Sequence, residues 1–404
     1  MKKLTLLIAV IFSLHLVAEP QHGVIYVVPN GTGTGASWTD ALGSIQDAIV
    51  LAKSDDMKRK DVWVKAGTYT VTTCISLADS VNVYGGFAGT ETDVAQRAKV
   101  TGGRAWDFVN PTILDGNNAQ RLIQVSSGTF DKETIFDGFT LMNGNGVGSA
   151  TSNSGGGAMI RPNTILQNCI VKNNNAIGSG GGVMLNGGGT VRHCLIMNNK
   201  QTTAANGGGG VFCNTSSTGY TGYIENCVVT GNSSTVRGAG VGIQGTTGYV
   251  YVTNCEIFNN TSYDVSNSAV KPGGGLYNNN LPYNRVMNCL IYNNTGLSAV
   301  YYNGGNFYNN TIVKNVGGMY ITGAVTCVNN IIWGCATDAT GTTATSLTGA
   351  VNTGTTVQNN ATYNPISTTN SWTTSDNFQF SSNVSNGDVL SPAEGTVGSG
   401  PKFN

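Results

Sequence analysis

One short pattern recurs along most of the chain and restricts its fold more than any other feature. It is an asparagine, once replaced by histidine, followed by a cysteine with apolar residues at fixed distances on both sides. The five copies are LQNCIVKNN (166–174), VRHCLIMNN (191–199), IENCVVTGN (224–232), VTNCEIFNN (252–260) and VMNCLIYNN (286–294). The same frame continues with asparagine in the cysteine position at Asn310, Asn330 and Asn360. Successive copies are never closer than 20 residues (310 to 330), which is typical of stacked repeats joined by loops of variable length.

The positions around each cysteine indicate short β-strands. The residue two places after it is a β-branched aliphatic residue in seven of the eight copies: Val171, Ile196, Val229, Ile257, Ile291, Ile312 and Ile332. A glycine-rich turn and a further strand precede each copy, as in GGGAMI (155–160) and GGGVML (180–185). Three short strands per repeat predict an all-β protein, a right-handed parallel β-helix with three strands per coil.

The cysteines and asparagines of the pattern then acquire distinct predicted roles. We expect the cysteines to stack inside the β-helix as small side chains: Cys169, Cys194, Cys227, Cys255 and Cys289. Because asparagine tolerates left-handed backbone, we expect the preceding residue to lie at a tight turn and to form a ladder of side-chain amides. That column contains Asn168, His193, Asn226, Asn254, Asn288, Asn309, Asn329 and Asn359. Thiols one coil apart are close enough for a disulfide, but the Cβ atoms of in-register strands point in the same direction. We therefore expect free thiols, with disulfide bonds as the alternative.

The two ends of the chain differ from the repeats. MKKLTLLIAVIFSLHLVA has a basic start, a short apolar run and small residues at its close, which predicts a signal peptide at residues 1–18. Residues 19–134 are predicted to hold the cap and first coils, with an amphipathic helix within 41–53 covering the open end of the core. The main repeats are expected at 135–364. Residues 365–404 contain few apolar side chains and no visible cap, which leaves the completeness of this end open.

Composition excludes several classes of function. The net charge is zero and only 10% of residues are charged, which argues against nucleic acid as a partner. After the signal peptide, no apolar stretch is long enough to span a membrane, so we expect an exported protein without a transmembrane segment. GTGTGA (31–36) fits a dinucleotide-binding pattern, but no second βαβ unit follows it, and no cofactor is predicted. LDGNN (114–118) could hold Ca²⁺, although a polar turn is the simpler reading.

Several N-terminal segments resemble a known family. IYVVPNGTGTGASWTDALGSIQDAI, DVWVKAGTYT, VNVYGGFAGTETDVAQR and TILDG are similar to the N-terminal part of exported right-handed parallel β-helix proteins of Bacteroidetes, within the pectin-lyase-like superfamily. The glycine-rich strands and asparagine-rich turns also resemble the repeats of chlamydial polymorphic outer-membrane proteins. The resemblance implies a secreted or cell-surface protein of a bacterium. Many such relatives carry a C-terminal sorting domain, and none is visible in this sequence, which leaves the means of surface retention open.

Polysaccharide cleavage, which the resemblance makes the main enzymatic alternative, has few candidate residues. A glycoside hydrolase needs paired carboxylates, and a calcium-dependent lyase needs several acidic ligands and a base. Between Gly138 and Cys335 the only acidic residues are Glu225, Glu256 and Asp264. Glu225 and Glu256 fall on different predicted strands. If the protein is an enzyme, these two and Arg237 are the candidates for catalysis.

Two features of the outward positions favour a binding surface instead. The residue after the anchor is apolar in five copies, Ile170, Leu195, Val228, Leu290 and Ile331, and is expected to point outward, against a covering loop or a partner. Tyrosines gather in the second half of the chain at Tyr249, Tyr251, Tyr277, Tyr283, Tyr292, Tyr301, Tyr302, Tyr308 and Tyr320, as strand residues or as surfaces for sugar. We therefore predict a non-catalytic secreted or cell-surface protein acting in adhesion, surface structure or glycan binding, whose partner is a polysaccharide or a ligand on a host or cell surface. A polysaccharide lyase or glycoside hydrolase is the alternative.

Overall fold

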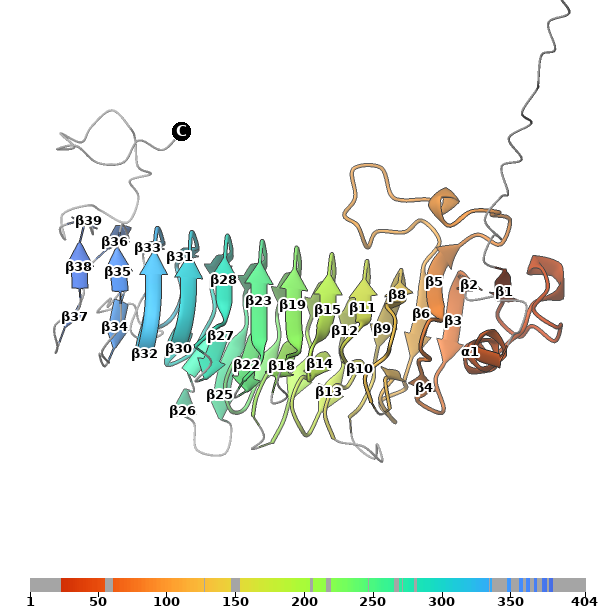
Figure 1. Cartoon of the computed structure of the whole chain (residues 1–404), viewed down its shortest axis with the longest axis horizontal. Helices are drawn as coiled ribbons and strands as arrows, with labels where there is room; N and C mark the ends of the chain where they lie inside the picture. Colours follow the sequence, from red (N-terminus) through yellow and green to blue (C-terminus); the bar gives the residue numbers. More distant parts are fainter. Residues whose placement is uncertain are drawn as a thin grey trace, which may run out of the picture.

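The computed structural model describes residues 23–335, apart from 55–60, 127, 147–152, 204–205, 216–218, 246, 265–268, 271, 280–281 and 334. Beyond residue 335 it describes six short strands, 347–349, 356–358, 361–363, 367–368, 373–375 and 378–380. The predicted signal peptide at 1–18 lies outside the described residues, as do Asn359 and most of 365–404. The described chain winds into coils that stack along one long axis (Figure 1).

The fold predicted from the repeats is confirmed. Strands of successive coils pair in parallel and form a 22-stranded sheet A, a 12-stranded sheet B and a five-stranded sheet C, and the last two strands of sheet C pair antiparallel. Each coil of the central part runs through two strands of sheet A, one of sheet B and a short one of sheet C. The three main strands per coil are those expected from the sequence, and the sheet C strands are mostly two residues long.

The strands have the following bounds. Sheet A contains β1 Val24–Val27, β2 Asp61–Lys65, β4 Ile75–Ser76, β5 Asn82–Phe87, β7 Ile123–Gln124, β8 Thr134–Asp137, β10 Ala158–Ile160, β11 Thr164–Gln167, β14 Val183–Asn186, β15 Gly189–Arg192, β18 Val211–Thr215, β19 Thr221–Glu225, β22 Val241–Gly245, β23 Tyr249–Thr253, β27 Pro272–Asn279, β28 Arg285–Met287, β30 Ser298–Tyr308, β32 Met319–Val328, β34 Leu347–Gly349, β35 Thr356–Gln358, β37 Ser367–Thr368 and β38 Thr373–Ser375. Sheet B contains β3 Gly67–Thr70, β6 Thr112–Asp115, β9 Phe139–Met142, β12 Ile170–Lys172, β16 Leu195–Met197, β20 Val228–Thr230, β24 Glu256–Phe258, β29 Leu290–Tyr292, β31 Thr311–Val313, β33 Ile331–Trp333, β36 Ala361–Tyr363 and β39 Phe378–Phe380. Sheet C contains β13 Asn175–Ala176, β17 Lys200–Gln201, β21 Ser233–Ser234, β25 Thr261–Asp264 and β26 Ala269–Val270.

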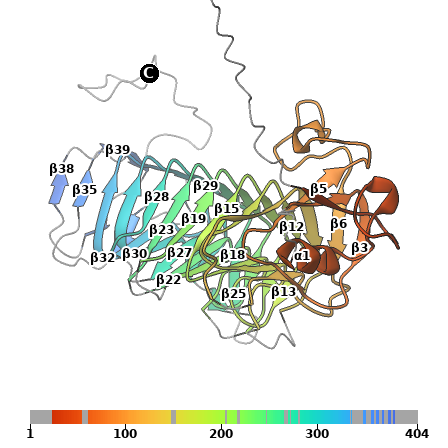
Figure 2. The same ribbon diagram turned by 45° about the vertical axis from the view of Figure 1, so that its right-hand side comes forward.

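A short helix closes the N-terminal end, as predicted. The helix α1 spans Ile45–Ser54, and Figure 2 shows it at the end of the stack of coils. Its buried residues, Ile45, Ala48, Ile49 and Ala52, belong to the same apolar core as the first strands. The glycine-rich loop before it packs on its own backbone, with the Gly33 N–H donating to the Ala41 carbonyl at 2.9 Å. The helix therefore shields the first coil from water.

Two left-handed turns shape each central coil, and each is followed by a residue that faces the core. In one coil the left-handed residues are Asn168 (φ 52°) and Asn173 (φ 56°), and the inward residues after them are Cys169 and Asn174. Val171, between the two turns, is fully buried, like its equivalents Ile196, Val229, Ile257, Ile291, Ile312 and Ile332. Burying each of these side chains contributes about 1.5–3 kcal/mol. The repeated frame is thus the sequence of one strand with a turn at each end.

The buried amide ladder follows the second turn of each coil. Its members are Asn174, Asn199, Asn232, Asn260, Asn294 and Asn315, all at most 1% exposed. The backbone N–H and the side-chain amide of Asn199 both donate to Oδ1 of Asn232, at 2.9 and 3.0 Å. The Asn199 amide also donates to the Val171 carbonyl at 2.9 Å. Each asparagine of the ladder thus pairs backbone and side-chain polar groups of the turn that would otherwise be buried without a hydrogen bond.

This placement corrects the predicted ladder. The described residues of the predicted column, Asn168, His193, Asn226, Asn254, Asn288, Asn309 and Asn329, all have left-handed backbone, and all but the half-buried Asn168 are exposed. Within that described column, a single amide-to-amide hydrogen bond is present, from Asn288 to Asn254 at 3.3 Å. The residue that takes up the left-handed turn points away from the core, and the residue after it points inward. The inward asparagine lies six positions further along the repeat.

The five cysteines of the pattern lie after the first turn and are at most 2% exposed. They carry free thiols. The Cys194 thiol donates to the Arg192 carbonyl at 3.2 Å, and the sulfur of Cys227 accepts the backbone N–H of Cys194. Sulfur therefore takes the acceptor role that the amide oxygen takes at the other turn, in addition to filling space.

A long connection, residues 88–111, joins β5 of sheet A to β6 of sheet B; we call it the arm. It includes a 3-10 helix, η2 Val94–Gln96, and rises beside the first coils (Figure 1). Arg97 anchors it through a buried ion pair with Asp137, 2.7 Å between Nη1 and Oδ1. The Arg97 guanidinium also lies over the ring of Phe108, 4.9 Å from its centre. These contacts fix the base of the arm on the β-helix.

Candidate functional site

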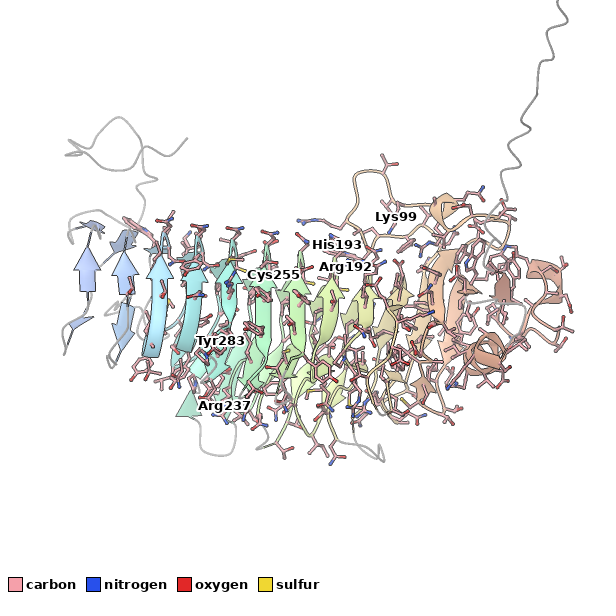
Figure 3. All side chains as sticks on the ribbon, viewed as in Figure 1. Lys99, Arg192, His193, Arg237, Cys255 and Tyr283 are labelled. Atoms are coloured by element: carbon pink, nitrogen blue, oxygen red, sulfur yellow. The ribbon has the colours of Figure 1, made fainter. Side chains whose placement is uncertain are left out.

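An exposed group of tyrosines lies on the outer face of sheet A; we call it the tyrosine cluster. It consists of Tyr223 on β19, Tyr249 and Tyr251 on β23, Tyr283 just before β28, and Arg285 on β28. Three of its rings are exposed, Tyr223 at 36%, Tyr249 at 41% and Tyr283 at 54%. Figure 3 shows Tyr283 on this face, well away from the edge that carries Cys255 and His193.

The register of the strands builds this cluster. Tyr223, Tyr251 and Arg285 occupy equivalent positions on successive coils, because β19 pairs with β23 and β23 with β28. The Tyr223 and Tyr251 rings are nearly parallel, with centres 5.4 Å apart, and the Arg285 guanidinium lies 5.7 Å from the Tyr251 ring. Both faces of Tyr251 are therefore already in contact with neighbours.

Tyr249 and Tyr283 form the more open pair. Their ring centres are 5.4 Å apart, but the rings are tilted by 36° to each other. The tilt and the high exposure leave ring surface free for a flat apolar ligand face. The side chain of the neighbouring Asn284 is turned inward, where its amide oxygen accepts the Val250 N–H at 2.9 Å.

A second tyrosine column runs along the other strands of sheet A. Tyr277, Tyr301 and Tyr320 are stacked in register, with ring centres 4.8 and 5.4 Å apart. Arg237 caps this column, since its guanidinium lies 5.0 Å from the Tyr277 ring and donates to the Tyr277 hydroxyl at 2.9 Å. Because these rings cover one another, the column presents ring edges and hydroxyl groups rather than free faces.

The remaining predicted tyrosines have other places. Tyr302 is fully buried in the core, where its hydroxyl donates to the Asn306 carbonyl at 2.9 Å, so it is no part of a binding surface. Tyr292 on β29 stacks on Phe258 with ring centres 4.7 Å apart, and its hydroxyl donates to Glu256 at 2.8 Å. Burial and this hydrogen bond raise the pKa of Tyr292 to about 12. Tyr308 is half-buried at the end of β30.

The three candidate catalytic residues are not brought together into one site. Glu225 ends β19 on sheet A, whereas Glu256 begins β24 on sheet B, on the other side of the cysteine turn. Arg237 lies at the opposite edge of the molecule from that turn, as its position relative to Cys255 in Figure 3 shows. Glu256 lines a groove.

That groove lies between the arm and the turns of three central coils; we call it the arm groove. Its volume is about 370 Å³, and it is lined by Arg104, Asn226, Cys227, Val228, Asn254, Cys255, Glu256, Asn288 and Leu290. A smaller cavity of about 110 Å³ lies nearer the base of the arm, between Trp106, Phe108 and Ile170 among others. The arm thus covers the beginning of the apolar outward row, as one of the two sequence interpretations proposed, while Leu290 further along remains 39% exposed.

The arm groove is not apparent from the amino-acid sequence. Arg104 is more than 100 positions from the asparagines that it faces, and nothing in the residues around it marks it as part of a site. The sequence does show the row of turn asparagines that lines the groove, but it suggests a ladder of amides there and not a binding surface. Within the described ranges, no three His, Cys, Asp or Glu side chains are grouped so that they could hold a metal ion. Asp115 of LDGNN accepts the Asn117 N–H at 2.9 Å and the Asn143 amide at 3.0 Å within a turn.

Comparisons with known proteins bear on the fold. No protein-family model matches the chain, and no curated protein matches its sequence. The A-module of the mannuronan C-5 epimerase AlgE6 of Azotobacter vinelandii is 14% identical, with a TM-score of 0.50 over 83% of this chain and 94% of that one. The pectate lyase Pel9A is 16% identical, with a TM-score of 0.48 over 80% and 79%. The surface protein and adhesin PfbA of Streptococcus pneumoniae is 13% identical, with a TM-score of 0.37 over 83% and 92%. At these identities the likeness shows the fold alone, a parallel β-helix.

Proposed function

We propose that this protein is exported and binds glycans through the tyrosine cluster, without cleaving them. The observation that carries the proposal is the open pair Tyr249 and Tyr283, beside a second stacked pair that ends on Arg285. Aromatic rings offer the C–H faces of sugars a flat apolar surface, and the hydroxyl and guanidinium groups around them can donate hydrogen bonds to sugar oxygens. A rigid sheet holds these groups in place before a ligand arrives, which lowers the entropic cost of binding.

Export is supported by the sequence of residues 1–18 and by the resemblance of the N-terminal segments to exported β-helix proteins of Bacteroidetes. No helix in the described part of the chain is long and apolar enough to cross a membrane. A surface role in adhesion fits the same features, because a long β-helix presents many equivalent positions along one face. A polysaccharide or a glycan-bearing cell surface is then the expected partner.

The alternative is polysaccharide cleavage as a lyase or hydrolase. One observation favours it, namely that Glu256 lies in the arm groove with Arg104 and three asparagines. Against it, the described residues that line the groove include no carboxylate besides Glu256, and one oxygen of Glu256 already accepts the Tyr292 hydroxyl. Paired carboxylates are the usual requirement for hydrolysis.

The test uses the mature protein against a panel of neutral, carboxylated and sulfated polysaccharides. Binding is measured by retardation in gels that contain each polysaccharide, and cleavage by release of reducing or unsaturated ends, with and without Ca²⁺. The proposal predicts retardation on at least one polysaccharide and no protein-dependent release of ends. Release of ends that is abolished by Glu256→Gln would replace the proposal with the enzymatic alternative, and absence of retardation on every polysaccharide would reject glycan binding.

A further inference from the structure

The arm holds the positive charge of Arg104 over the groove, and no carboxylate of the described residues forms an ion pair with it. Arg104 is exposed, and the described part of the chain gives its guanidinium no hydrogen-bond or ion-pair partner. The acid nearest to it in sequence, Asp107, accepts the backbone N–H of Arg104 at 2.7 Å instead. Arg104 is therefore placed by the fold of the arm and not by a salt bridge of its own.

The arm is built to keep that position. Asp137, which pairs with Arg97 at its base, also accepts the amides of Gln167 and Asn168 at 2.6 and 2.7 Å. Trp106 and Phe108 are buried under the arm on either side of Asp107. The Val100 N–H donates to the Asp107 carbonyl at 2.8 Å, which closes the loop that carries Arg104. The loop that carries Arg104 is therefore held in place before a ligand arrives, which lowers the entropic cost of binding.

The opposite wall of the groove presents a regular set of groups. Asn226, Asn254 and Asn288 are exposed and follow one another on successive coils, at a spacing of roughly one strand separation, ~4.8 Å. Val228 and Leu290 add apolar surface beside them, and Glu256 lies between the two. Amides can donate to and accept from hydroxyl groups, and the aliphatic side chains can contact C–H faces.

We propose that the arm groove binds an anionic chain, a glycan that carries carboxylate or sulfate groups, and that Arg104 contacts the anionic group. The five-donor guanidinium matches a carboxylate or sulfate oxygen pair, and charge-assisted hydrogen bonds of this kind are the strong ones. The asparagine row takes the hydroxyl groups of the same chain, which runs along the long axis of the β-helix. This inference rests on the proposed function and adds to it the charge of the ligand and a second contact region.

Glu256 is the group that opposes this ligand. It lies across the groove from Arg104 and forms no ion pair with it among the described contacts. Its Oε1 accepts the Tyr292 hydroxyl, which leaves its other oxygen to a ligand hydroxyl. Removing the charge of Glu256 is expected to strengthen binding of an anionic chain, whereas removing that of Arg104 is expected to weaken it.

The experiment measures dissociation constants of the mature protein for one carboxylated, one sulfated and one neutral polysaccharide. Arg104→Ala is expected to weaken binding of the anionic chains by about tenfold or more, the loss of one charge-assisted hydrogen bond. Arg104→Lys is expected to recover part of the loss, and Glu256→Gln to strengthen binding by severalfold. Lys132→Ala, which removes one exposed positive charge outside the groove, is the matched control and is expected to change little.

The outcomes separate this inference from the proposed function. A selective loss on the carboxylated chain identifies carboxylate as the anionic group, and a selective loss on the sulfated chain identifies sulfate. Equal affinity of the wild type and Arg104→Ala for every polysaccharide would overturn the inference while leaving glycan binding intact. Equal losses for Arg104→Ala and Lys132→Ala would also overturn it, because they would reduce the effect to net charge. Each variant is first checked for an unchanged melting temperature.

Discussion

The backbone N–H of Cys289 donates to Oδ1 of Asn310 on the next coil, at 2.9 Å. At this point the column of thiols becomes a column of amides, because Asn310 in turn donates its N–H and its amide to Asn330 at 2.9 and 3.1 Å. The reverse change ends the other column, where the Asn315 amide lies 4.0 Å from the sulfur of Cys335. Cysteine and asparagine therefore serve the same purpose after a left-handed turn, which is to accept the N–H of the preceding coil.

The first prediction uses this equivalence. Cys289→Asn is expected to cost less than about 1 kcal/mol, because the new amide can donate to Asn310 and accept from Cys255 as the other amides do. Cys289→Ala is expected to cost about 1–3 kcal/mol, since it leaves a cavity and an unpaired N–H. Urea unfolding of the two variants checks the order, and a larger loss for asparagine than for alanine would contradict the equivalence.

The second prediction compares a buried amide with an exposed one. Asn260→Ala removes the acceptor for two Asn232 donors, at 2.9 and 3.0 Å, and is expected to cost about 3 kcal/mol or more. Asn309→Gly, at an exposed turn position with φ 55°, is expected to change stability by less than about 1 kcal/mol, because glycine readily adopts left-handed backbone. Similar losses of stability for the two variants would show that the exposed asparagines stabilise the fold as much as the buried ones do.

The third prediction concerns alkaline pH. Burial raises the pKa values of the Cys194, Cys227 and Cys289 thiols well above the ordinary value for cysteine. It raises the pKa of the Cys327 thiol to about 12. Each of these thiols stays protonated in the folded chain and ionises in the unfolded chain above about pH 8.5. The stability that they contribute is thus fully present below that pH and falls above it, by up to about 1.4 kcal/mol per pH unit for each thiol.

Urea unfolding between pH 7 and 9.5 measures that fall. The serine hydroxyl of Cys227→Ser does not ionise in this range. This variant is therefore expected to show a smaller fall of unfolding free energy per pH unit, by the contribution of one thiol. A free energy of unfolding that stays constant up to pH 9.5 would contradict the raised pKa values of these thiols. A thiol reagent at pH 8 gives an independent reading, since the five stacked cysteines are expected to react only after unfolding.

The fourth prediction addresses the base of the arm. Arg97→Ala leaves the Asp137 carboxylate buried without its ion-pair partner, and is expected to cost about 3 kcal/mol, near the low end for buried pairs because Gln167 and Asn168 still donate to it. The arm is also expected to become sensitive to proteases in the native state. A variant with wild-type stability and an uncut arm would show that the ion pair does not anchor it.

Much of the fold could be predicted because the same strand pattern recurs in each copy of the repeat. The aliphatic column from Val171 to Ile332 and the helix at Ile45–Ser54 were both predictable from periodicity alone. The position of the ladder was not, since Asn168 and Asn174 are the same residue type and differ only in which one takes the left-handed backbone. The turn reverses the expected alternation, so counting residues from the cysteine gives the wrong face.

The candidate site was predictable in part. The tyrosines could be named, and the alternation of strand residues places Tyr249 and Tyr251 on one face. Which rings remain open depends on the stacking of neighbours, as the contrast between Tyr283 and the fully buried Tyr302 shows. The arm groove depends on a contact between Arg104 and coils more than 100 residues away, which no local pattern specifies.

The proposed function requires Tyr249 and Tyr283 to bind glycan. The most direct measurement is the affinity of Tyr249→Ala/Tyr283→Ala for the polysaccharide that retards the wild type most strongly, with Tyr263→Ala, an exposed tyrosine on β25, as the matched control. Glycan binding by these two rings predicts a loss of affinity of about tenfold or more for the double variant, at about 1 kcal/mol per ring, and little change for the control. Wild-type affinity in a folded double variant would show that the two rings do not bind glycan.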